Sequence, residues 1–182
     1  MDRSITTEPV LSGSIFNVER CGWTAADGTP VQRLVVRHPG AVCIVPVLPD
    51  GRVVLVGNAR LAAAERLWEL PAGKLEAGEA PIETARRELI EETGWHAADM
   101  VSLGKFYTSP GFCDEIMHCF VAAGLTEGTP QPEPGEDLVV RIVDREELWA
   151  MLDVGDMIDG KSLAALLLWQ RHMHRLHVGG AD

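Results

Sequence analysis

Patterns of apolar and polar residues divide this chain into strands, one central helix and two helices near the C-terminus. Short β-rich runs between turn signals predict strands at residues 14–20, 31–37, 41–48, 52–57, 100–107, 115–122 and 138–143. Apolar residues at helical spacing predict helices at residues 79–93, 145–152 and 162–175. Because strands and helices mix without regular βαβ alternation, we expect an α/β or α+β fold with helices packed on a mixed sheet.

The length of 182 residues suits one domain with a substantial core. We expect an irregular tail at residues 1–13, a single domain at residues 14–176 and a short tail at residues 177–182. Within this frame the central helix carries the strongest chemical signal.

Three glutamates share one side of that helix. Glu88, Glu91 and Glu92 fall within an arc of about 100°. An adjoining apolar arc can pack inward: Ile82, Ala85 and Leu89. Pro81 suits the first turn of the helix, and Gly94 suits the left-handed position after its last turn. Since carboxylates at i and i+4 repel, a divalent cation with oxygen ligands is the natural partner of this surface.

The surrounding residues follow a fixed spacing: Gly, five residues, Glu, seven residues, then Arg-Glu-aliphatic-X-Glu-Glu-X-Gly-apolar. The matching positions are Gly73, Glu79, Arg87, Glu88, Leu89, Glu91, Glu92, Gly94 and Trp95. This pattern resembles the signature of the Nudix hydrolases, whereas the alternative is a charged surface helix flanked by glycines. The resemblance implies an α/β/α sandwich around a mixed sheet. It also implies a homodimer that the N-terminal strands help to build.

The same resemblance implies a site for Mg²⁺, or alternatively Mn²⁺. Its principal ligands would be Glu88, Glu92 and the carbonyl group of Ala72, while Glu91 would bind or bridge a second ion. Arg87 would orient this catalytic cluster by pairing with Glu79; an ordinary ion pair within the helix is the alternative. Such an ion neutralises phosphate charge and lowers the pKa of a bound water. Gly73 has no side chain, so a diphosphate or ion can approach its backbone closely.

The general base is a separate question. By resemblance to ADP-ribose hydrolases of the family it would be a glutamate in the loop before a late strand. Here that loop reads P-E-P-G-E-D, so we expect Glu136, with Glu133 and Asp137 as alternatives. A solvated acidic loop without a catalytic role is the other interpretation.

Two segments outside the signature narrow the substrate class. Residues 68–73 read W-E-L-P-A-G, and Pro110 lies 16 residues beyond Gly94, a combination that resembles the ADP-ribose pyrophosphatase subgroup. The resemblance implies these substrate-binding residues: Arg60 at the nucleotide or diphosphate, Pro110, Gly111 and Phe112 shaping the pocket, and Glu115 near the terminal ribose or catalytic loop. A surface charge for Arg60 and core packing for Phe112 are the alternatives.

One departure lies between Arg60 and Glu69, where A-A-A-E replaces the glycine-containing turn that the subgroup leads us to expect. Contacts to the base from this turn, or from Phe16 and Arg33, are therefore not assigned.

Together these features predict metal-dependent hydrolysis of ADP-ribose to AMP and ribose 5-phosphate. Alternatives are another nucleoside diphosphate derivative (GDP-mannose, UDP- or ADP-glucose, or flavin adenine dinucleotide) and a non-catalytic Nudix domain that senses nucleotide sugars. Sensing domains usually lose a metal-binding glutamate, but Glu88, Glu91 and Glu92 are all present.

Composition limits the partners. A net charge of −11 disfavours binding to nucleic acid, because no basic stripe exists to displace counterions. No apolar run reaches membrane-spanning length and no export signal is evident, so we expect a cytoplasmic protein. The four cysteines lack C-x-x-C spacing, and we expect them to be reduced.

Overall fold

A computed structural model describes residues 5–132, 135 and 137–179 of the chain. The strands are β1 (Thr6–Ser12), β2 (Asn17–Thr24), β3 (Pro30–Arg37), β4 (Ala41–Pro46), β5 (Val53–Arg60), β6 (Glu65–Glu69), β7 (Ala72–Lys74), β8 (Trp95–Tyr107), β9 (Ile116–Glu127) and β10 (Leu138–Val143). The helices are α1 (Pro81–Thr93), α2 (Arg145–Val154) and α3 (Gly160–Gly179). No helix within these residues is long and apolar enough to cross a membrane.

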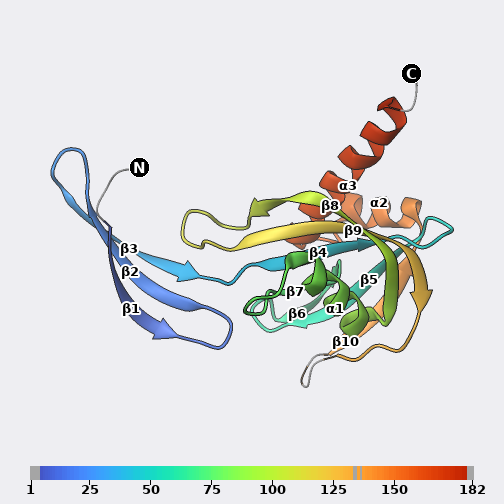
Figure 1. The fold of residues 1–182 in the computed structure, drawn as a ribbon, viewed down its shortest axis with the longest axis horizontal. Coiled ribbons are helices and arrows are strands. Elements are labelled where there is room, and N and C mark those ends of the chain that lie inside the picture. Colours follow the sequence, from blue (N-terminus) through green and yellow to red (C-terminus); the bar gives the residue numbers. More distant parts are fainter. Residues whose placement is uncertain (1–4, 133–134, 136, 180–182) are drawn as a thin grey trace.

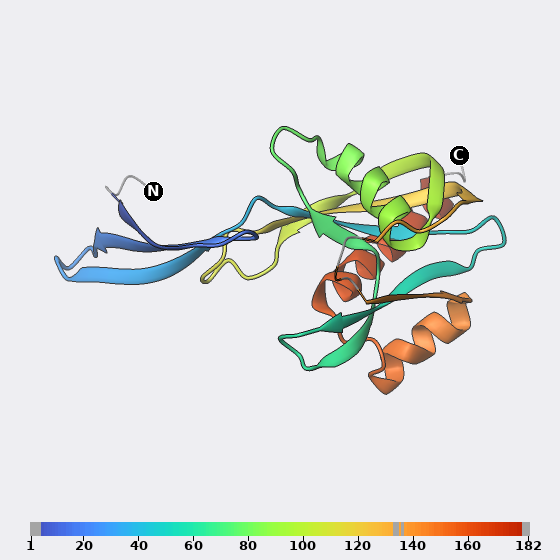
Figure 2. The same ribbon diagram turned by 90° about the horizontal axis from the view of Figure 1, so that it is seen from below.

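Two sheets build the body of the molecule, in the orders β7-β4-β9-β8 and β10-β5-β6. Strand β4 runs parallel to β9, and the other neighbours are antiparallel, so the expected mixed sheet is present. Helix α1 lies on one side of the four-stranded sheet and α3 on the opposite side, while α2 lies beside the three-stranded sheet (Figure 2). This arrangement confirms the predicted α/β/α sandwich.

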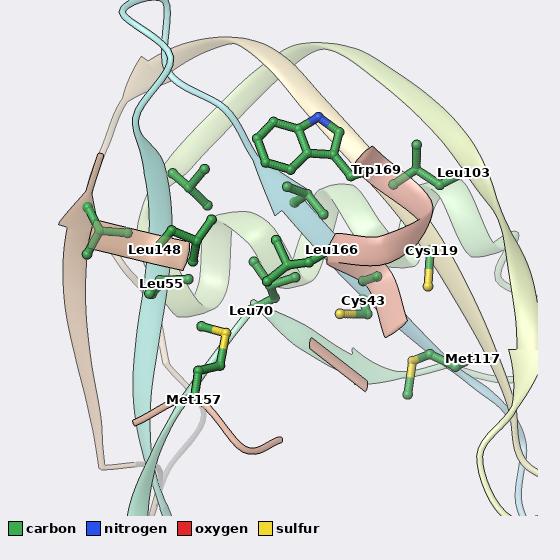
Figure 3. Packing of buried hydrophobic residues seen from close by; sticks show 14 of the residues in the cluster. Cys43, Leu55, Leu70, Leu103, Met117, Cys119, Leu148, Met157, Leu166 and Trp169 are labelled. Carbon is green, nitrogen blue, oxygen red and sulfur yellow. The ribbon is translucent and has the colours of Figure 1, made fainter. Parts of the chain in front are cut away.

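Strand β4 lies at the centre of the core and is buried along its whole length. Its alternate side chains enter two different clusters, as the period of two in a strand requires. Cys43 and Val45 pack with Leu166 and Trp169 of α3 (Figure 3), whereas Ile44 joins Leu89 of α1 in the other cluster. A six-residue apolar run therefore holds helices on both faces of the sheet.

The four cysteines are free, as expected. Cys43 and Cys119 are paired positions on neighbouring parallel strands and are fully buried. Burial raises the pKa of the Cys119 thiol to about 12 and that of Cys43 well above its usual value. Both side chains therefore serve as small apolar groups of the core.

Strands β1, β2 and β3 form a separate antiparallel sheet that projects from the body (Figure 1). The sequence predicts an irregular tail at residues 1–13, and this is wrong for β1, which pairs with β2 from Thr6 to Ser12. All seven residues of β1 are exposed, so no alternation of burial marks the strand in the sequence. Backbone pairing with β2, rather than burial, makes this strand.

The main chain attaches this sheet to the loop between β8 and β9. The N–H of Val36 in β3 donates to the Phe112 carbonyl at 2.7 Å, and the Asp114 N–H donates to the Val36 carbonyl at 3.1 Å. Arg37 donates to Glu19 of β2 at 2.7 Å and to Asp114 at 3.1 Å. The sheet and the loop are thus joined by main-chain bonds and by the ion pair of Arg37 with Asp114, while the pair of Arg37 with Glu19 lies within the sheet.

Helix α1 follows its prediction closely but not at every residue. It begins at Pro81, and Gly94 adopts φ 76° after its last turn, with its N–H bonded to the Ile90 carbonyl at 2.8 Å. Ala85 and Leu89 are fully buried, but Ile82 is 36% exposed. The inward arc therefore begins after the first turn, and the prediction for Ile82 is wrong.

Candidate active site

A cavity of about 300 Å³ lies where the turn before α1 meets the N-terminal part of α3. Six residues predicted for the site line it: Arg60, Ala72, Gly73, Arg87, Glu88 and Glu115. They come from β5, β7, α1 and the loop before β9, which are far apart in the sequence. The fold therefore brings the signature turn and helix together with two residues that lie outside the signature.

Gly73 lies directly against the carboxyl group of Glu88. A Cβ atom at position 73 would be 1.9 Å from Glu88 Cδ and 2.0 Å from Oε1, distances that no real contact permits. Strand β7 pairs with β4 through Gly73 and Val42, so the backbone at position 73 is fixed by the sheet. Glycine is required here because the carboxylate occupies the space of a side chain.

Arg87 holds three of the nearby carboxylates. Its guanidinium donates to Glu79 at 3.1 and 3.3 Å, and to Glu88 and Glu91 at 2.8 Å each. The hydrogen bonds to Glu79 and the charge of Glu88 raise the pKa of Arg87 above its usual value, against the effect of burial. The same bonds lower the pKa of Glu79. Arg87 is therefore a permanent cation that fixes the acidic side of α1.

Glu92 lies behind the cavity wall and is only 4% exposed. Its Oε2 accepts a hydrogen bond from the Ala72 N–H at 3.0 Å, which links α1 to the turn before Gly73. Neither Glu91 nor Glu92 lines the cavity itself. Glu91 is instead held at its edge by Arg87, with 28% of its side chain exposed.

A second charged cluster contributes to the site. Glu69 is 1% exposed and binds Arg60 through two hydrogen bonds, of 2.8 Å to Nε and 2.6 Å to Nη2. Lys161 also binds Glu69, and it donates to Asp159 at 2.9 Å. The bonds to Glu69 raise the pKa of Arg60 despite partial burial. Arg60 is thus an ordered cation in the cavity wall rather than a free surface charge.

The predicted pocket residues Pro110, Gly111 and Phe112 do not line this cavity. Phe112 is 58% exposed, so core packing does not describe it either. The loop that carries these residues bonds instead to β3 through its main chain. In the single chain, this loop is the attachment point of the N-terminal sheet.

Several cavity residues were not predicted from the sequence: Ile15, His38, Ala41, Lys74, Glu76, Met117 and Lys161. His38 Nδ1 accepts from the Gly40 N–H at 3.1 Å and lies 3.5 Å from Glu115. Lys74 and Glu76 belong to the signature turn, and their position next to Gly73 could have identified them. Lys161 carries no such signal, because it lies 88 positions beyond Gly73 and only the docking of α3 brings it to the cavity.

Glu133 and Glu136, the candidate general bases, lie outside the described residues. The segments on either side of them are anchored. The Gln131 N–H donates to the Glu91 carbonyl at 2.8 Å, and Asp137 pairs with Arg66 at 2.6 Å. The first anchor places the start of this acidic loop beside the motif helix.

The donors around Gly73 fit a divalent cation. Three carboxylates, those of Glu79, Glu88 and Glu91, gather around the guanidinium of Arg87, and Glu92 accepts the Ala72 N–H beside Gly73. Carboxylate oxygen is the ligand that Mg²⁺ and Mn²⁺ prefer. Within the described residues, no three acidic, His or Cys side chains already converge on one point. Binding an ion would therefore require the carboxylates that Arg87 holds to turn toward it.

Comparison with known proteins agrees with this geometry. Residues 37–166 match the NUDIX domain. The chain is 35% identical to an ADP-ribose pyrophosphatase of Bacillus subtilis (strain 168), over 91% of this chain and 90% of that protein. It is 38% identical to a methanol dehydrogenase activator of Bacillus methanolicus, over 79% of this chain and 77% of that protein.

Among solved structures, an ADP compounds hydrolase superposes with a TM-score of 0.81 at 24% identity, covering 96% of this chain and 95% of that one. This likeness shows the fold, while the family match and the sequence identities over most of the chain show the relationship. The chain belongs to the Nudix family.

Proposed function

We propose that this protein hydrolyses the diphosphate of ADP-ribose to give AMP and ribose 5-phosphate. The observation that carries the proposal is a single cavity that joins the carboxylate of Glu88, the bare backbone of Gly73 and the ordered guanidinium of Arg60. The ADP-ribose pyrophosphatase relative, which aligns over nearly the whole chain, supports the same substrate.

The residues of the cavity divide the work between binding and orientation. Arg60 has its Nε and one Nη2 hydrogen turned to Glu69, which leaves further N–H donors for a phosphate oxygen. Arg87 holds the carboxylates of Glu79, Glu88 and Glu91 in fixed positions relative to one another. Glu92 fixes the Ala72 turn against α1, and Gly73, the next residue, lines the cavity together with Glu88.

A divalent metal is the general requirement of Nudix hydrolases, and we assign Mg²⁺, with Mn²⁺ as the alternative. Glu88, Glu92 and the Ala72 carbonyl would hold it, with Glu91 at a second ion. When bound, the ion offsets the diphosphate charge and makes an attacking water easier to deprotonate.

For the general base we keep Glu136, with Glu133 as the alternative. Asp137 is the weaker candidate because Arg66 already binds its carboxylate at 2.6 Å. Glu136→Gln should lower kcat about 100-fold or more, and Glu133→Gln much less, when both are followed across a pH–rate profile. The reverse order would move the role to Glu133.

The N-terminal sheet supports a homodimer. Its apolar side chains include Leu11 and Leu34, which are 54% and 56% exposed in the single chain. Exposed apolar surface of this kind marks a contact surface. Light scattering of the wild type should give the mass of a dimer, and Leu11→Asp with Leu34→Asp should give a monomer. A monomeric wild type would refute this assembly.

A cytoplasmic location also stays a prediction.

The test of the activity is incubation of pure protein with ADP-ribose and Mg²⁺, with both products identified by chromatography. Release of AMP and ribose 5-phosphate is the expected result. A panel containing GDP-mannose, ADP-glucose and flavin adenine dinucleotide ranks the alternatives within the class. Binding of ADP-ribose without cleavage would identify a sensing domain instead and overturn the proposal.

A further inference from the structure

Lys161 has no role in the function described so far, yet it lines the cavity together with Arg60. It lies at the start of α3, and only 13% of its side chain is exposed. Burial of a lysine is costly unless its charge is compensated. Here Glu69 and Asp159 compensate it, and both carboxylates bind its ammonium group.

These four side chains form a group whose charges cancel: Arg60, Lys161, Glu69 and Asp159. They are nevertheless arranged unequally about the cavity. Both cations are in its lining, whereas neither carboxylate is. Glu69 lies behind them at 1% exposure, and Asp159 is turned to the Ser162 N–H at 3.0 Å and the Ser162 hydroxyl at 2.5 Å. The positive side of a neutral group therefore faces the cavity.

This arrangement bears on how much charge Arg60 can offer to a substrate. A carboxylate bound through two hydrogen bonds neutralises most of the field of the guanidinium that it holds. Glu69 fixes Arg60 in this way, so Arg60 alone offers hydrogen-bond donors in fixed positions but little net positive charge. Lys161 binds the same carboxylate, so a second cation lies beside Arg60 in the cavity lining, whereas the carboxylate of Asp159 that balances its charge lies outside that lining.

We propose that Lys161 is a second substrate-binding cation, which acts with Arg60 on the phosphate groups of a nucleoside diphosphate. The inference rests on the proposed function for the identity of the ligand. Glu69 then binds both cations from behind the cavity wall and holds them in place. The signature turn and helix contribute Gly73 and Glu88 to the lining of the same cavity.

The surroundings of Lys161 keep it charged. Burial acts to lower its pKa, but the charges of Asp159 and Glu69 outweigh burial and raise the pKa. Asp159 in turn keeps a lowered pKa, since Lys161 and the bonds from Ser162 outweigh the effect of burial on it. The hydroxyl of Ser162 also accepts the Leu70 N–H at 2.8 Å, which ties the start of α3 to the strand segment that carries Glu69.

The test measures binding separately from turnover, using the α,β-methylene analogue of ADP-ribose and isothermal titration calorimetry. Lys161→Met removes the charge and keeps the length of the side chain. Lys105→Met is the matched control, because Lys105 is an exposed lysine of β8 outside the cavity. Lys161→Arg retains the charge.

Loss of one charge-assisted contact corresponds to a Kd raised about tenfold in Lys161→Met, with Lys105→Met unchanged and Lys161→Arg within about threefold of the wild type. The dependence of Kd on KCl should also become less steep in Lys161→Met, as expected when a phosphate-binding charge is removed. With ADP-ribose as substrate, KM should rise while kcat changes less than about threefold.

A purely structural role for Lys161, as the counter-charge of Glu69, is separated by a double variant. Glu69→Gln with Lys161→Met balances the charges and should recover the melting temperature lost in Lys161→Met alone. If Lys161 binds substrate, the double variant still binds the analogue about tenfold more weakly than Glu69→Gln alone. Equal affinities of these two variants would overturn the inference, even if Lys161→Met itself does not fold.

The outcomes for the two proposals remain distinct. Protein that binds the analogue but leaves ADP-ribose whole contradicts the hydrolase, and the variants still decide the role of Lys161. Protein that cleaves ADP-ribose, with Lys161→Met behaving like Lys105→Met, contradicts the role of Lys161 alone.

Discussion

The body of the molecule and its N-terminal sheet contain strands of similar length but opposite burial. All six residues of β4 are buried, and they pack with helices on both faces of the sheet. All seven residues of β1 are exposed, although β1 pairs with β2 along most of its length. Pairing with β2, through main-chain hydrogen bonds and the ion pair of Glu8 with Arg20, thus accounts for the N-terminal strand, while side-chain packing accounts for the central one.

The two regions therefore obtain their stability from different interactions. The body buries a large core, and most residues that line the cavity belong to elements packed on that core. The sheet of β1, β2 and β3 has apolar side chains in solvent and gains little stability from burial. It therefore depends on its attachment to the body and on any further surface that covers it.

The largest expected effect comes from the buried glutamate of the site. Glu92→Gln keeps the size of the side chain and an acceptor for the Ala72 N–H but removes its charge. We expect kcat to fall by about 1000-fold or more, because the proposed metal site would lose one of its charged ligands. Steady-state kinetics with ADP-ribose measures it. Glu83→Gln, on the exposed side of the same helix, is the control and should keep kcat within about twofold. A fully active Glu92→Gln would contradict the site.

The next effect tests the comparison itself with two leucines. Leu89→Ala in α1 empties a fully buried position and should cost about 2–5 kcal/mol of the free energy of unfolding. Leu34→Ala in β3 removes a side chain that is 56% exposed and should cost less than about 0.5 kcal/mol in dilute protein. Urea denaturation followed by fluorescence measures both. Equal costs would show that the sheet is packed as the body is.

A smaller effect depends on pH and belongs to the start of α3. Asp159 pairs with Lys161 at 2.9 Å, and asparagine keeps an acceptor for the Ser162 N–H but loses this charge, so Asp159→Asn should cost about 1 kcal/mol at pH 7. The pKa of Asp159 is lowered in the folded protein, mainly by Lys161 acting against burial. Its contribution is therefore complete above the unfolded pKa of about 3.9 and is lost as pH falls through the lower folded value. Denaturation of both proteins at several pH values should show the difference shrinking below about pH 4. A difference independent of pH would contradict the ion pair.

The smallest effect is a gain. Ala64 is the only described residue other than glycine with a positive φ, at 56°. It lies in the turn where the sequence replaces an expected glycine, so Ala64→Gly should relieve the left-handed strain and raise stability by about 0.5 kcal/mol. A rise in Tm of about 1–2 °C in calorimetry would agree with this value, and a fall in Tm would refute it.

The sequence was sufficient wherever local spacing determines structure. The spacing of the glutamates and of Pro81 and Gly94 predicted α1 to within two residues at its start. The apolar run at residues 41–48 predicted the buried strand. In each case the spacing of residues, or a residue suited to one backbone conformation, indicates the local structure directly.

The sequence was insufficient wherever distant segments meet. Lys161 reaches the cavity only because α3 packs on the four-stranded sheet, and no motif near it indicates this. Strand β1 has no alternation, because neither of its faces is buried. The loop at Pro110 was assigned to the pocket, yet its main chain bonds to β3. Pairing partners of this kind depend on the whole fold.

The bonds between Val36 and the loop after β8 have a consequence for how the cavity is adjusted. Glu115, at the end of that loop, lines the cavity, and so does Ile15, which lies between β1 and β2. Two residues that line the cavity thus belong to the N-terminal sheet or to the loop that attaches it to the body. A change in the angle between the N-terminal sheet and the body would therefore alter the width of the cavity without a change in the residues that line it.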